Sequence, residues 1–196
     1  MSDPVEQNLG VSIKRSTEFI AAIHSQTQMV LVEISGILEK HKFESVRGTS
    51  IFVPVRSMNI QSPEAWCHKV VARLFGEGGK SQKSTHLVAV EAHFAPTFGV
   101  DEAVVVLGFA RLSEGHGRED LQASYEEHGW VATVFENTEF RSDSVQKHAG
   151  GTPGWQPFPD LEELRVIAWP LVSFDSSETV KRKVSEGLRK LGAIKA

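Results

Sequence analysis

The sequence predicts an α+β fold, with a mostly antiparallel sheet of about five strands, flanking helices and a long N-terminal helix. Three observations predict it: a seven-residue apolar repeat near the N-terminus, two strongly apolar segments at 86–95 and 102–112, and a capped amphipathic helix at 175–191. The 196 residues suffice for one domain with a sizeable core. We expect an N-terminal helical segment at 1–48 and an α+β core domain at 49–196.

The N-terminal segment predicts a helix from about Ser12 to Lys42, with Gly10 interrupting or fraying what precedes it. Apolar residues recur there in a heptad pattern, at positions 13, 20, 23, 30, 34 and 37. A seven-residue repeat keeps such side chains on one stripe of a helix, ready for a facing helix. The second half is more apolar, so we expect it to pack on the sheet while the first half projects. The stripe serves either the chain's own core or another chain.

The remaining elements follow from local signals. Ser62 and Pro63 are a helix cap and a first-turn proline, which predicts a helix at 62–75. The two apolar segments predict a hairpin buried on both faces. Pro170 bends the last strand or leaves it at an edge. The full prediction comprises strands at 51–56, 86–95, 102–112, 130–136 and 164–174, helices at 62–75, 119–127 and 175–191, and a Gly/Pro-rich loop at 141–160.

Glu91 and His93 form the first candidate catalytic pair. Residues two apart on a strand share a face, so both should stand side by side in an otherwise apolar run. A carboxylate in apolar surroundings has a raised pKa, which suits acid–base chemistry or a metal site. If the turn is symmetric about residue 99, Arg111 shares that face. The structural alternative is then a partly exposed strand face, or a buried pair satisfied by Arg111.

His116 is the second candidate, because Gly115 and Gly117 on either side let it adopt unusual backbone angles and reach into a cleft. Loop histidines near carboxylates can bind metal or shuttle protons, although such a stretch also suits a solvated turn before a helix. Together with Glu91 and His93, it supports an alternative function, a metal-dependent hydrolase of the phosphodiesterase or nuclease type. Only that alternative implies a divalent-metal cofactor.

Trp155 and Phe158 stand in the Gly/Pro-rich loop at 141–160. Large aromatic side chains on such a segment can anchor a partner or close over a ligand. They can equally hold the loop onto the body of the domain. The first use gives a second alternative function, a small-ligand sensor with an aromatic lid.

Composition argues against two classes of partner, nucleic acids and membranes. The net charge of −4 argues against nucleic-acid binding, and no run approaches the ~18 apolar residues that span a membrane. Cys67 is the single cysteine, so no internal disulfide forms, and we expect a cytoplasmic protein. No catalytic motif is complete. The leading prediction is a non-enzymatic binding or assembly module, a homo-oligomer or a subunit of a cytoplasmic complex, which contacts itself or another protein through Ile20, Ile23, Val30 and Ile34.

Overall fold

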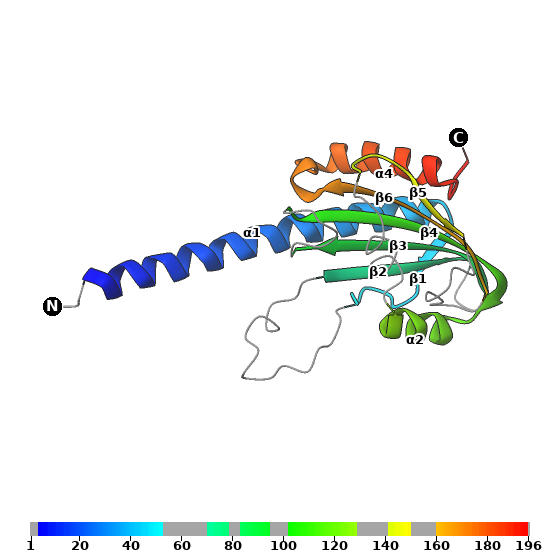
Figure 1. Cartoon of the computed structure of the whole chain (residues 1–196), viewed down its shortest axis with the longest axis horizontal. Coiled ribbons are helices and arrows are strands. Elements are labelled where there is room, and N and C mark those ends of the chain that lie inside the picture. The colour runs from blue at the N-terminus through cyan, green and yellow to red at the C-terminus, as the bar shows by residue number, and fades with distance from the viewer. Residues whose placement is uncertain are drawn as a thin grey trace.

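The computed structural model of the chain describes residues 4–52, 70–78, 83–94, 102–128, 141–149 and 160–195. They form a six-stranded antiparallel sheet in the order β1-β2-β3-β4-β6-β5, with helices on both of its faces (Figure 1), which confirms the α+β prediction. The elements are α1 (Pro4–Lys40), β1 (Phe43–Ser45), β2 (Val70–Glu77), β3 (Ser84–His93), β4 (Val104–His116), α2 (Arg118–His128), β5 (Gln146–Ala149), β6 (Leu161–Pro170), a 3-10 turn (Leu171–Ser173) and α4 (Ser177–Leu191).

The central strands are buried on both faces, as their continuous apolar runs predict. Alternate side chains point to opposite sides, so each strand supplies two cores. Val88 and Val90 of β3 face α1 and α4, whereas Leu87 and Ala89 belong to a second core that α2 completes. The sheet is therefore a middle layer, with α1 and α4 on one side and α2 on the other.

The closing helix α4 forms where its cap and amphipathic pattern predict it. The Ser176 side chain accepts a hydrogen bond from the backbone N–H of Thr179, and Gly192 ends the helix with a left-handed φ of 76°. The apolar face of α4 is fully buried between α1 and the sheet. Glu33 of α1 joins the two helices, because its carboxylate accepts a hydrogen bond from Ser177 and lies 3.4 Å from Lys181 Nζ.

Helix α1 runs from Pro4 through Gly10 without a break, so the predicted interruption at Gly10 is wrong. Its second half packs against the sheet and α4, and Gln26 donates hydrogen bonds to the carbonyls of Leu171 and Phe174. Its first half extends beyond the ends of the strands (Figure 1). The predicted division into a packed half and a projecting half is confirmed.

Two element predictions are wrong. Residues 70–75, predicted to end a helix, belong to β2, and β2 pairs with β3 over most of its length. The predicted loop contains β5, which pairs with β6 and makes β6 an interior strand that ends at Pro170. At 51–56 the structure describes only 51 and 52, where Phe52 forms an isolated bridge with Ala72. The predicted strand at 130–136 lies outside the described residues.

None of the helices that the structure describes is both long and apolar enough to cross a membrane.

Candidate functional site

The heptad stripe of α1 divides between the core and the surface. Val30 and Ile34, predicted to contact a partner, are each only 1% exposed and belong to the core of this chain. Ile23 also packs against that core, although it is partly exposed. Ile20 is different, because 48% of its surface is exposed. The core of this chain therefore buries the C-terminal part of the predicted interface. Of the four predicted residues, Ile20 is the one that stays well exposed to a partner.

Three exposed apolar residues on the projecting half continue the line of the buried ones. Eighteen positions make five turns of a helix with about 3.6 residues per turn, so residues separated by that number project in the same direction. Ile13, Phe19 and Ile20 are 59%, 66% and 48% exposed. The residues eighteen positions later, which are all buried in the core, are Leu31, Ile37 and Leu38. We call Ile13, Phe19 and Ile20 the exposed stripe.

Glu91 and His93 lie together in a buried polar cluster with Tyr125 of α2. His93 Nε2 is 2.8 Å from Glu91 Oε2, and the Tyr125 hydroxyl donates a hydrogen bond to Glu91 Oε1. All three residues are at most 4% exposed. Burial, followed by the negative charge of Glu91, raises the pKa of Tyr125 well above its usual value. The phenol therefore stays a hydrogen-bond donor at neutral pH.

Arg111 is not the partner of this cluster, contrary to the sequence-based alternative. Glu91 stands opposite Val106 rather than Leu107, so the hairpin is centred half a residue earlier than position 99. A shift of one position in the pairing moves a side chain to the other face of the sheet. Arg111 accordingly faces away from Glu91, and its Nε lies 2.8 Å from Glu162 Oε2. Tyr125 takes the role that Arg111 was predicted to have.

His116 is not part of the same cluster. It is the last residue of β4 and not a loop residue as predicted. It stands opposite Ser84, seven positions along β3 from Glu91, which corresponds to about 23 Å on an extended strand. There His116 Nε2 contacts the carboxylate of Asp160. Among the described residues, no group of three or more His, Cys, Asp or Glu side chains is placed to hold a metal ion. The structure thus does not bring the three candidate catalytic residues together.

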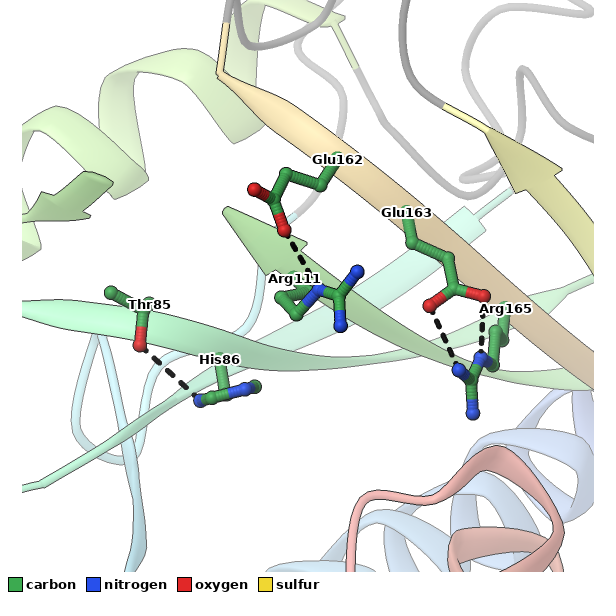
Figure 2. Close-up of polar contacts among 6 residues, drawn as sticks. All are labelled: Thr85, His86, Arg111, Glu162, Glu163 and Arg165. Atoms are coloured by element: carbon green, nitrogen blue, oxygen red, sulfur yellow. Dashed lines mark hydrogen bonds and ion pairs between the residues drawn. The ribbon is translucent and has the colours of Figure 1, made fainter. Parts of the chain in front are cut away.

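A row of polar side chains crosses the sheet on the same face as α1 and α4 (Figure 2). Arg111 reaches Glu162, and Glu163 accepts hydrogen bonds of 2.8 Å from both Nε and Nη2 of Arg165. That pairing lowers the pKa of Glu163 and raises the pKa of Arg165. Arg165 Nη1 also donates to the carbonyl of Leu191, 3.0 Å away at the C-terminus of α4. These charges are matched, and they fasten α4 to the sheet.

A pocket of about 550 Å³ opens beside α1, where the helix crosses β2. Its wall on α1 includes Thr27, Gln28 and Leu31, and its wall on the sheet includes Val71 and Arg73. The rings of His24 and Phe94, which also line the pocket, lie 5.9 Å apart between their centroids. Pockets of ~300–1,000 Å³ with mostly apolar walls and a few polar groups are the usual form of small-molecule sites.

Among the described residues that line this pocket, Arg73 is the one Lys, Arg, Asp or Glu side chain. Its Nη1 donates to Ser35 Oγ and its Nη2 to the carbonyl of Gly48, while its Nε is buried without an acceptor among the described residues. Burial lowers the pKa of Arg73, and Glu39 opposes that shift only from beyond ion-pair distance. Sequence reasoning missed Arg73, since it fell within a predicted helix, where an arginine signals an exposed face.

Trp155 and Phe158 lie outside the described residues, so the lid prediction stays a prediction. Comparisons of the chain with protein families, with curated proteins and with solved structures find no significant match.

Proposed function

We propose that this protein is a cytoplasmic assembly module that forms a homodimer through the exposed stripe of α1. One observation carries the proposal: Ile13, Phe19 and Ile20 continue the buried face of the helix beyond the sheet that covers it. The core of the chain thus buries this apolar face over the C-terminal half of α1, whereas the face is exposed over the N-terminal half. A surface of this kind supports a binding role rather than a catalytic one.

The energetics of the projecting half favour a partner. Residues 10–22 are all exposed, and they extend about 20 Å as a helix. A free helix of that length is marginal in water, and most helical stability comes from packing an apolar face. Burying one large aliphatic or aromatic side chain contributes about 1.5–3 kcal/mol. Burying three such side chains against a facing helix would therefore contribute substantially to the free energy of association.

The charges beside the stripe favour a second copy of the chain. Arg15 and Glu18 lie on the projecting half and carry opposite charges. Two copies related by a twofold axis present the same patch to each other, in opposite directions. An axis that passes between residues 16 and 17 of antiparallel helices puts Ile13 opposite Ile20 of the second copy. It also puts Arg15 opposite Glu18, which lies 3.8 Å from Lys14 Nζ of its own chain, and it puts Phe19 opposite Lys14. One apolar pair and one pair of opposite charges therefore match.

The experiment is light scattering coupled to size exclusion on the full chain and on two variants. Ile20→Asp places a charge in the exposed stripe, and Val172→Asp places the same charge at a 74% exposed apolar residue outside α1. We expect a dimeric mass for the wild type and for Val172→Asp, and a monomeric mass for Ile20→Asp. A wild-type monomer over the micromolar range, or an Ile20→Asp variant that remains dimeric, would contradict the proposal.

A further inference from the structure

The charge of Arg73 distinguishes the pocket beside α1 from the rest of the sheet. Arg111, Arg118 and Arg165 each have a carboxylate oxygen 2.8 Å away. Arg73 has no carboxylate within ion-pair distance among the described residues, and its hydrogen bonds go to one hydroxyl and one carbonyl. A guanidinium carries five N–H donors. Its Nε is buried without an acceptor among the described residues, so the guanidinium keeps an unused donor and a charge with no carboxylate directly beside it.

The surroundings of Arg73 make that unmatched charge costly. The guanidinium is partly buried: it lies over the ring of Phe75 at 5.1 Å and its Nε is shielded from water, whereas its hydrogen bond to Gly48 is exposed. An anion beside it would offset the lost hydration through charge-assisted hydrogen bonds, which are about twice as strong as neutral ones. The pocket thus favours a ligand with a negative group at its Arg73 end.

The apolar part of the lining sets the chemistry of the rest of the ligand. The apolar residues that line the pocket are Leu31, Val32, Ile51, Val71 and Phe94. They form a surface for a hydrocarbon or aromatic body, and the polar residues His24, Thr27, Gln28 and Thr49 complete the described lining. The volume of about 550 Å³ is of the size that small organic ligands occupy.

We propose that the pocket between α1 and β2 binds a small amphipathic carboxylate, whose carboxylate pairs with Arg73 and whose apolar body lies against Leu31, Val71 and Phe94. This site is separate from the exposed stripe, because none of Ile13, Phe19 and Ile20 lines the pocket. Ligand binding and self-association can accordingly succeed or fail independently.

The first experiment compares octanoate with 1-octanol by titration calorimetry, since the two share a chain and differ in the charged head. We expect octanoate to bind the full chain with one site per protomer. We expect 1-octanol to bind roughly tenfold more weakly or worse, because it cannot form the charge-assisted hydrogen bonds that a carboxylate makes with Arg73. Arg73→Met should reduce octanoate affinity to that of 1-octanol and leave 1-octanol unchanged. Equal affinities of the wild type for both probes, or no octanoate binding at all, would overturn the proposal.

A second variant tests the pocket independently if Arg73→Met folds poorly. Val32 lines the pocket but is 59% exposed, so Val32→Trp can fill the pocket without entering the core. Val172→Trp is the matched control, because Val172 is exposed and does not line the pocket. We expect Val32→Trp to abolish octanoate binding and Val172→Trp to retain it. Wild-type affinity in Val32→Trp would locate octanoate elsewhere and refute the assignment.

Discussion

At the scale of single residues, the cluster of Glu91, His93 and Tyr125 is best understood as a structural network. A buried carboxylate needs donors, and it has one on its own strand and one from α2. The ring of Tyr125 also packs on Phe52, with 5.0 Å between the ring centroids. The cluster therefore links α2 to the sheet through both polar and aromatic contacts.

Replacing Tyr125 with Phe tests this network. The ring and its packing remain, but Glu91 loses a donor inside the core. We expect the free energy of unfolding to fall by about 1–3 kcal/mol at neutral pH, the cost of leaving a buried acceptor unsatisfied. Urea unfolding followed by circular dichroism measures it. An unchanged unfolding free energy would show that Glu91 is satisfied without the phenol.

The raised pKa of Tyr125 also predicts a loss of stability in alkali. The folded state holds the phenol proton more tightly than the unfolded state, in which Tyr titrates near pH 10. The resulting stabilisation is complete below pH ~10 and is lost as the pH rises from there through the folded pKa. Tyr125 is the only tyrosine. Tyrosinate absorbance should consequently appear only as the protein unfolds, and a titration near pH 10 in the folded protein would contradict the buried position.

Two glycines give opposite predictions for the same substitution. A Cβ on Gly187 of α4 would lie 2.6 Å from Cη2 of Trp169, whose indole is held by a hydrogen bond to Asp143, whereas a Cβ on Gly36 of α1 meets nothing within 4 Å. Alanine in a free helical site stabilises by up to ~1 kcal/mol. Overpacking a core costs about 1–3 kcal/mol. We expect Gly36→Ala to raise and Gly187→Ala to lower the urea midpoint, and a shift in the same direction for both would be inconsistent with this packing.

At the scale of elements, the sequence predicts the central hairpin and α4 well, because their signals are local. The burial of β3 and β4 is visible as apolar runs at 87–90 and 104–110, and the cap at Ser176 marks the start of α4. For β2 the same reasoning fails. Its residues are buried on both faces, so the apolar positions Val71, Leu74 and Phe75 also match a helical period. Periodicity alone does not separate these two cases.

The pairing register of the strands explains most of the errors in the sequence-based prediction of the candidate sites. The predicted face of Glu91 depended on the position of the turn, and a difference of one position in the pairing removed Arg111 from it. Tyr125 is 34 residues from Glu91, and the sequence gives no measure of how α2 lies against the sheet. Its spacing of four from Leu121, which places both on one helical face, was the available signal.

At the scale of the whole molecule, α1 connects the core to a surface that the core does not use. The sequence reveals the continuous stripe but not where the sheet stops covering it, since that depends on the length and tilt of strands elsewhere. In the structure the division falls between Ile20, which is 48% exposed, and Thr27, which is 4% exposed. Substitutions on either side of this division should behave differently, since those after it damage the fold and those before it affect only assembly.

This difference predicts how thermal stability depends on protein concentration. If only the native state dimerises, mass action stabilises it, and the melting temperature should rise by about 2 °C for each tenfold increase in concentration above the dissociation constant. Ile20→Asp should lose this dependence and melt at the wild-type temperature extrapolated to low concentration, because Ile20 lies outside the core. Ile34→Asp should instead melt far lower at every concentration, since it buries a charge in the core. Scanning calorimetry at several concentrations separates the two cases, and a lower melting temperature of Ile20→Asp at all concentrations would mean that the exposed stripe serves folding rather than assembly.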